Sequence, residues 1–226
     1  FKGADRYRWV TRNTNATPVA SFWKPLKEYC DKKGIIFFST PMSRGAAKLL
    51  NEEVGVDLWK VGSGDILDFV MLDYLASTKK TIIISGGMST LAEVDNSVDF
   101  LKRRGTQLAL MHCVSKYPCP TEDLNLRTVE FFKQRYNVPV GFSDHSIGID
   151  SALASVALGA TIIEKHFSLS RDLWGSDHKV ALTPDELKFL VDGVRKIETD
   201  PRLKEEYLNK EVVKAGLGQV DKILQS

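Results

Sequence analysis

Residues 139–166 read PVGFSDHSIGIDSALASVALGATIIEKH, and this stretch decides the fold. It begins with a short apolar run that ends at His145. A segment with an apolar helical stripe through Leu153 and Val156 follows, and a second apolar run ends at His166. Apolar runs of this length, bounded by turn residues, are typical of buried parallel strands. A strand, a helix and a second strand in this order predict one βαβ unit of a parallel sheet.

Similar apolar runs recur along the chain, with helical patterns between them. The runs are 34–40, 58–64, 81–87, 108–114, 139–145 and 160–166. This alternation fits either an open doubly wound sheet or a closed (β/α)8 barrel. Polar residues follow every run rather than a single pair of runs, which favours the barrel. We therefore expect an α/β protein with a (β/α)8 TIM-barrel fold that is incomplete in this chain, with about six βα units present and the first two strands missing.

The remaining segments surround this predicted barrel. Residues 1–20 are polar without a clear period, and we expect them to be irregular. We assign residues 21–200 to the partial barrel domain and residues 201–226 to a charged, partly helical C-terminal segment. Two helix starts are also specified: Thr90 is followed by an acid three residues later, and Thr183 precedes a proline.

Composition excludes several classes of protein. Of the 226 residues, 43% are hydrophobic and 27% are charged, as in ordinary globular proteins. A net charge of +2 without a dense basic tract gives no support for nucleic-acid binding. No apolar run approaches the roughly 20 residues that cross a bilayer, and no signal-peptide pattern is present, so we expect a cytoplasmic protein without membrane contact.

Two histidines at strand ends are candidate metal ligands. Side chains alternate between the two faces of a strand, so Ser143 shares a face with His145, and Glu164 shares one with His166. In a barrel, these faces line the same central cavity. Two imidazoles from adjacent strands can hold one divalent ion and leave positions open for water and substrate. A structural, hydrogen-bonded histidine is the alternative for either one alone, and for His112 it is the preferred interpretation.

The other strand ends carry hydroxyl groups, glycines and one lysine. Hydroxyls, backbone N–H groups and a lysine ammonium are the groups that bind a phosphate. Lys60 could instead extend its charge from the sheet to solvent. The pattern predicts a phosphorylated small-molecule substrate bound by Thr40, Lys60, Ser63, Ser85 and Ser143.

An ordered set of motifs resembles the sialic acid synthase (N-acetylneuraminate synthase) family, which includes the legionaminic and pseudaminic acid synthases and the spore-coat polysaccharide synthases. The segments are FFSTPMS (37–43), WKVGSGD (59–65), ISGGMST (84–90), HCVSKYPCP (112–120), GFSDHSIG (141–148), ALGATIIEKHF (157–167) and GSDH (175–178). The resemblance implies a transferase that condenses phosphoenolpyruvate with an N-acetylated aminosugar, such as N-acetylmannosamine or a bacterial analogue. The products would be a nine-carbon 2-keto sugar acid and phosphate.

The resemblance also implies roles for individual residues. His145 and His166 would bind the divalent metal, Mn²⁺ or Mg²⁺. Asp65, which stands where the family often has glutamate, would take part in proton transfer. The strand pattern itself places Glu164 on the face of His166, where we expect it to be a metal ligand, a partner of the metal ligands or a catalytic carboxylate. The phosphoenolpyruvate pocket would be lined by Thr40, Lys60, Ser63, Ser85, Ser115 and Ser143. Tyr117 and Asp177 would face the sugar.

The family pattern extends beyond this chain. Its first two strands and its C-terminal antifreeze-like domain, which contributes an arginine across a dimer, have no counterpart here. We therefore expect a homodimer for the full-length protein and no turnover by this chain alone. Two alternatives stay open: another metal-dependent barrel lyase or hydrolase, which would need the histidines but not phosphoenolpyruvate, and a non-catalytic barrel fragment.

Overall fold

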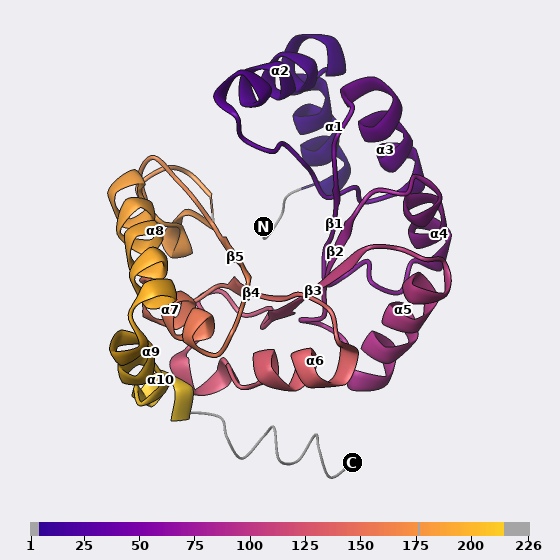
Figure 1. The fold of residues 1–226 in the computed structure, drawn as a ribbon. Coiled ribbons are helices and arrows are strands. Elements are labelled where there is room, and N and C mark those ends of the chain that lie inside the picture. The colour runs from indigo at the N-terminus through magenta and orange to yellow at the C-terminus, as the bar shows by residue number, and fades with distance from the viewer. Residues whose placement is uncertain (1–4, 176, 215–226) are drawn as a thin grey trace.

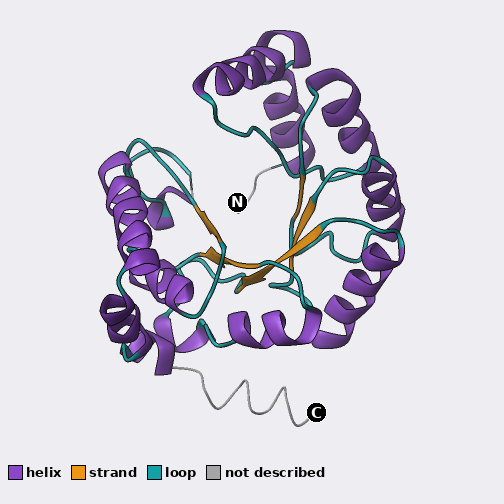
Figure 2. Cartoon of the chain, viewed as in Figure 1, coloured by secondary structure: helices purple, strands orange, loops and turns teal. Residues whose placement is uncertain are grey.

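A computed structural model describes residues 5–175 and 177–214. Its centre is one parallel sheet in which the spatial order of the strands, β1-β2-β3-β4-β5, is their order in the chain (Figure 2). The strands are β1 (Trp59–Val61), β2 (Ile82–Ser85), β3 (Leu108–Cys113), β4 (Val140–Asp144) and β5 (Ile162–Lys165).

The helices lie on the outer side of the sheet. They are α1 (Arg6–Ala16), α2 (Lys24–Lys33), α3 (Arg44–Leu49), α4 (Phe69–Ser77), α5 (Leu91–Arg103), α6 (Thr128–Tyr136), α7 (Asp150–Ala157), α8 (Pro184–Thr199), α9 (Pro201–Leu208) and α10 (Glu211–Lys214). Short helical turns occupy Val19–Trp23, Leu50–Val54, Thr121–Asp123 and Asp177–Val180. Figure 1 shows the helices as an arc around the curved sheet, open between α8 and α2. This half-barrel confirms the predicted α/β barrel architecture and its incompleteness.

Two segments differ from their predictions. The run 34–40 is not a strand, because its one ladder contact is an isolated parallel bridge from Ser39 to Trp59. Ile35 and Ile36 are 60% and 63% exposed, whereas Phe37 packs against the core without strand pairing. The opening segment, expected to be irregular, contains α1, whose first N–H groups are capped by the carboxylate of Asp5.

Both predicted helix starts are confirmed. The hydroxyl of Thr90 accepts from the N–H of Glu93, whose carboxylate accepts from the N–H of Thr90, and this capping box opens α5. Thr183 and Glu186 form the same arrangement at the start of α8. These contacts saturate N–H groups that a helix cannot satisfy by itself.

The two faces of the sheet bury different residues. The outer face packs against the helices through fully buried side chains that include Trp59, Ile82, Leu110 and Phe142. The inner face carries a small apolar cluster of Ile83, Ala109 and Met111. Its polar residues lie towards the carboxyl ends of the strands, so the fold collects them at one end of the sheet.

Gly141 makes the close packing of the inner face possible. A Cβ at this position would stand 2.5 Å from the carbonyl oxygen of Ile162 and would overlap the sulfur of Met111. Any side chain would therefore push β4 away from β3 and β5, and the alignment of the strand ends depends on this glycine.

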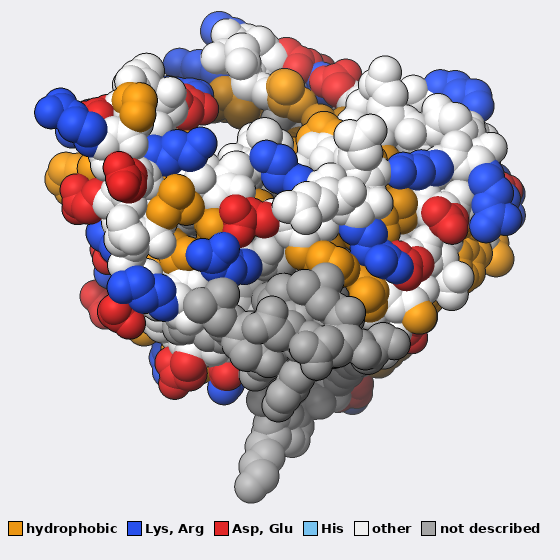
Figure 3. All heavy atoms as spheres, turned by 60° about the horizontal axis from the view of Figure 1, so that its bottom comes forward, with side chains coloured by type: hydrophobic (Ala, Val, Ile, Leu, Met, Phe, Trp, Pro, Cys, Tyr) orange, Lys and Arg blue, Asp and Glu red, His pale blue; other side chains and the backbone are white. Residues whose placement is uncertain are grey.

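The surface of the described residues is mixed in charge. On the face seen in Figure 3, basic and acidic side chains are interspersed rather than gathered by sign. Among the helices of the described residues, none has both the length and the apolar character needed to cross a membrane.

Candidate active site

Four polar residues meet on the inner face of the sheet. The ammonium of Lys60 on β1 donates to the hydroxyl of Ser85 on β2 at 2.7 Å. It also lies 3.5 Å from the carboxylate of Glu164 on β5. The other oxygen of that carboxylate accepts from the hydroxyl of Ser143 on β4 at 2.6 Å. Four strands therefore contribute to one hydrogen-bonded cluster, which we call the inner polar cluster.

Burial of Lys60 and its two serine partners strengthens the attraction of the cluster for anions. Lys60, Ser85 and Ser143 are 7%, 2% and 3% exposed, whereas the Glu164 side chain is 41% exposed. The ammonium thus points inward rather than extending to solvent. A buried ammonium attracts anions more strongly than a solvated one because the low dielectric weakens screening.

Three aromatic rings lie at the carboxyl end of the same face. The ring centres of His145 and His166 are 5.3 Å apart. The ring of Tyr117 lies 4.1 Å from that of His145 and 5.7 Å from that of His166. Tyr117 is 50% exposed, so it forms the outer wall of this group. Partial burial raises the pKa of its phenol.

The hydrogen bonds of His145 fix its tautomer. Nδ1 lies 3.1 Å from the carbonyl oxygen of Val114, which can only accept, so Nδ1 carries the proton. Nε2 then keeps its lone pair free for a metal. Burial and, next, the charge of His166 lower the pKa of His145 below 6.5. The side chain is therefore neutral at neutral pH, as a metal ligand must be.

Thr40 and Asp65 both lie next to Gly62, just beyond β1. A Cβ at Gly62 would be 3.8 Å from both Asp65 Oδ2 and Thr40 Cγ2. Burial, together with the nearby charge of Asp68, raises the pKa of the Asp65 carboxyl, which favours proton uptake.

Other predicted residues form the rim of the site. Ser63 accepts from the N–H of Gly87 at 3.0 Å and so connects the loops after β1 and β2. Ser115 is exposed in the loop after β3. The carboxylate of Asp177 lies 3.8 Å from Nδ1 of His166. The structure thus places the predicted site residues along the ends of β1 to β5 and in the loops that follow.

The histidine pair suits one divalent ion. With metal–nitrogen bonds of about 2.1 Å, two imidazoles on one ion have ring centres roughly 5 Å apart. The observed 5.3 Å matches this spacing. Within 5–175 and 177–214, no group of three or more His, Cys, Asp or Glu side chains could hold a metal. The two imidazoles predicted as metal ligands therefore stand without a third such side chain in this part of the chain, and water and substrate would have to complete the shell of any bound ion.

His112 is a structural residue, as its sequence position indicates. It is 6% exposed on the outer face, its Nε2 lies 2.6 Å from the carbonyl oxygen of Leu124, and its ring stacks on Phe142 at 5.6 Å. Burial lowers its pKa to about 4. A neutral ring donates Nε2–H to the carbonyl, which leaves this histidine no part in the inner site.

Two features of the site do not follow from the sequence motifs. Cys113 lies on the inner face, with its sulfur 3.8 Å from Nδ1 of His145. The buried ion pair of Asp144 and Lys165 is the second feature. Both could have been found by aligning the strands in parallel register, which pairs Cys113 with Ser143 and Asp144 with Lys165.

This combination defines a class of protein: a parallel α/β barrel in which a buried lysine is hydrogen-bonded to strand hydroxyls beside two imidazoles. Comparison with known proteins then identifies the family. Residues 11–203 match the NeuB family, and the chain belongs to it.

Similar proteins agree with this assignment. The chain is 39% identical over 178 residues to the N,N'-diacetyllegionaminic acid synthase of Campylobacter jejuni, covering 77% of this chain and 53% of that protein. It is 34% identical over 177 residues to the human N-acetylneuraminate-9-phosphate synthase, covering 78% and 49%. Among solved structures, it is similar to the N-acetylneuraminic acid (sialic acid) synthetase from Leptospira borgpetersenii in complex with citrate. The TM-score is 0.75 and the sequence identity is 36%, and the match covers 83% of this chain and 70% of that chain. The chain spans about half the length of the curated relatives it matches.

Proposed function

We propose that this chain forms part of an enzyme that condenses phosphoenolpyruvate with an N-acetylated aminosugar. The observation that carries the proposal is the inner polar cluster, in which the buried Lys60 ammonium bonds to Ser85 at 2.7 Å, beside the His145–His166 pair. Membership of the NeuB family supports the same reaction, because the related proteins are named as synthases of sugar acids.

The proposed reaction forms one carbon–carbon bond. Carbon 3 of phosphoenolpyruvate bonds to the aldehyde carbon of the sugar, and the aldehyde oxygen takes a proton to become a hydroxyl. Water adds its oxygen to carbon 2, the bond from carbon 2 to the phosphate oxygen breaks, and a keto group remains. The products are a nine-carbon 2-keto sugar acid and inorganic phosphate.

The residues have separate tasks in this proposal. Lys60, Ser85 and Ser143 bind the anionic groups of phosphoenolpyruvate, together with the rim residues Thr40, Ser63 and Ser115. A phosphate competes with Glu164 for the Lys60 ammonium, which frees this carboxylate to act as a base. Asp65, whose carboxyl has a raised pKa, takes the proton of the attacking water.

The metal and the sugar lie at the carboxyl end of the strands. His145 and His166 hold Mn²⁺ or Mg²⁺, which when bound polarises the aldehyde carbonyl. Tyr117 and Asp177, which both lie close to His166, contact the sugar. The acceptor is N-acetylmannosamine or a bacterial analogue; relatives of similar identity are named for different products, so the choice among these sugars is a matter for assay.

We also propose that turnover needs more than this chain. The five strands form an open sheet within the described residues, whereas a closed barrel of this class has eight strands that together line the cavity. We therefore expect the 226-residue chain alone to bind metal without turnover. The complete gene product is proposed to be an active homodimer, a state that light scattering would measure.

The test uses the complete gene product with Mn²⁺, phosphoenolpyruvate and a panel of 2-acetamido hexoses. We expect phosphate release matched one to one by a keto acid in the mass spectrum. Lys60→Met should lower kcat/KM for phosphoenolpyruvate at least about 100-fold, because it removes a charge-assisted bond to the substrate. The control Lys188→Met removes an exposed lysine from α8 and should leave kcat/KM within about twofold.

Absence of phosphate release across the panel would overturn the proposal. If the protein instead showed another metal-dependent activity, and His145→Gln abolished that activity, we would conclude that it is a lyase or hydrolase on the same scaffold.

A further inference from the structure

A buried ion pair lies behind the candidate metal site, on the outer face of the sheet. The ammonium of Lys165 is 2.8 Å from Oδ2 of Asp144, and the two side chains are 3% and 0% exposed. The parallel register places Asp144 on β4 directly beside Lys165 on β5. Each member of the pair immediately precedes one of the two site histidines in the sequence.

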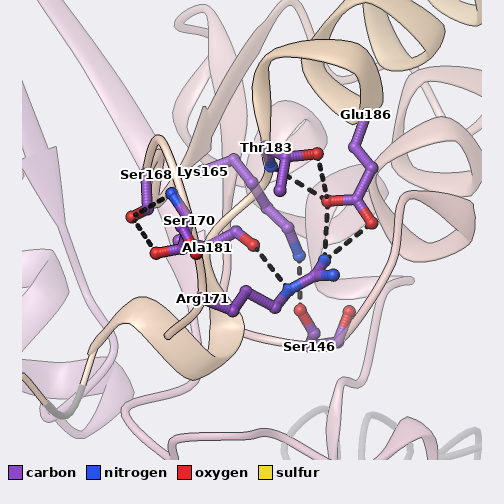
Figure 4. Close-up of polar contacts among 8 residues, drawn as sticks. All are labelled: Ser146, Lys165, Ser168, Ser170, Arg171, Ala181, Thr183 and Glu186. Atoms are coloured by element: carbon purple, nitrogen blue, oxygen red, sulfur yellow. Dashed lines mark hydrogen bonds and ion pairs between the residues drawn. The ribbon is translucent and has the colours of Figure 1, made fainter. Parts of the chain in front are cut away.

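The same two side chains also hold the backbone around His145. The second carboxylate oxygen of Asp144 accepts from the N–H of Ser146 at 2.8 Å. The ammonium of Lys165 donates to the carbonyl oxygen of Ser146, as Figure 4 shows. The residues before and after His145 are therefore fixed to each other and to β5. The carbonyl of His145 itself accepts from the N–H of Cys119 at 3.0 Å.

Stability alone does not account for this arrangement. Burying two charges carries a large desolvation penalty, and apolar residues of the same volume are often equally or more stabilising at such positions. An apolar pair could not bond to the N–H and carbonyl of Ser146, however. What the charged pair provides is a defined backbone path where β4 leaves the sheet, at the point where its histidine turns towards the inner face.

We infer that Asp144 and Lys165 are positioning residues that hold His145 and His166 at the spacing one metal ion requires. The pair joins the two strands one residue before each histidine, so a change in its geometry moves one imidazole relative to the other. The inference rests on the proposed function in one respect, namely that the two histidines are metal ligands.

The test measures Mn²⁺ binding by the chain through the electron paramagnetic resonance signal of the free ion. Asp144→Asn keeps an oxygen for the Ser146 N–H but removes the charge, and Lys165→Met removes all three donors at similar length. We expect each to weaken Mn²⁺ binding about 10- to 100-fold, as loss of groups that orient metal ligands does. Asp95→Asn, which breaks the pair with Arg135 between α5 and α6, is the matched control and should stay within about twofold of wild type.

Circular dichroism and thermal melts establish that each variant is folded. If Lys165→Met does not fold, the double variant Asp144→Asn with Lys165→Gln restores a neutral hydrogen-bonded pair, and we expect it to fold and to recover part of the affinity. Folded variants that bind Mn²⁺ as tightly as wild type would overturn the inference.

A metal-free measurement separates this inference from the proposed function. The imidazole ¹⁵N shifts of His145 should report a single Nδ1–H tautomer in wild type and a mixture in Asp144→Asn. If wild type binds no Mn²⁺, the proposed function fails, and the inference then depends on these shifts alone. Identical shifts in wild type and variant would refute the positioning role.

Discussion

The buried His112 should make the stability of the fold depend on pH in a way that one substitution removes. Its ring is enclosed between β3, Phe142 and the Leu124 carbonyl, and burial lowers its pKa from 6.5 to about 4. In the unfolded chain, the same side chain takes up a proton near its ordinary pKa of about 6.5. Between these two values the unfolded state binds more protons than the folded state.

Stability must therefore fall as the pH falls through this window. The contribution is fully present above pH 6.5 and is lost progressively down to about pH 4, where the folded protein also takes up the proton. A difference of roughly 2.5 pKa values at 1.36 kcal/mol each gives a loss of about 3 kcal/mol. This is a large share of the 5–15 kcal/mol typical of a domain.

The assay is urea unfolding of wild type and His112→Gln at a series of pH values from about 7 to 4. Glutamine can still donate to the Leu124 carbonyl but takes up no proton. The variant should be less stable at pH 7, because it loses the stacked ring, and the two stabilities should converge as the pH falls. All other groups titrate equally in both proteins, so their effects cancel in the difference. Parallel curves would refute a neutral, buried His112.

Three further substitutions test the packing. Gly87→Ala would bring a Cβ within 2.8 Å of the Cys113 sulfur and 2.9 Å of its carbonyl oxygen. We therefore expect the free energy of unfolding in urea to fall by about 1–3 kcal/mol. In the control Gly64→Ala, the new Cβ meets nothing within 4 Å, and the free energy of unfolding should change little. Phe142→Ala empties a fully buried position and should cost about 3–5 kcal/mol by the same measurement; a smaller loss would mean that the site collapses around the gap. Asp95→Asn weakens a partly exposed pair with Arg135 but keeps an oxygen that accepts from Tyr136, so it should cost about 1 kcal/mol in thermal melts. A clearly larger cost would show that the pair is better organised than its exposure indicates.

The sequence predicts the sheet well because β1 to β4 are buried along their whole length, and β5 is partly buried. Five of the six apolar runs contain strands of the structure, and each run continues into residues of the site. The exception, 34–40, has an equally strong apolar pattern but only one bridging contact, at Ser39. A pattern records which residues prefer burial, whereas a strand also requires a partner for its N–H and carbonyl groups.

The first helix is the opposite case, an element that forms although the sequence pattern does not predict it. Residues 6–16 are helical, yet the described side chains of α1 are largely exposed. A helix that packs little against the core has no reason to carry an apolar stripe, so a search for periodicity does not find it. Its one sequence signal is the cap at Asp5.

Within the site, alternation along each strand predicts which residues share a face, as for Ser143 with His145 and for Glu164 with His166. It does not predict which strands lie side by side, and the contacts missed from sequence all cross between strands. The Cys113–His145 and Asp144–Lys165 contacts depend on the register between neighbouring strands, which alternation within a single strand does not give.

The sequential strand order of the sheet bears on how the chain can fold during its synthesis. Because β1 to β5 pair strictly in chain order, each new strand finds its partner already present at the end of the preceding βα unit. Each pairing then joins strands that are one βα unit apart in the chain, which costs less loop-closure entropy than pairing strands from distant parts of the chain. The sheet can grow one strand at a time behind the ribosome, and the histidines, carried by its last two strands, would meet only when the fifth strand is added.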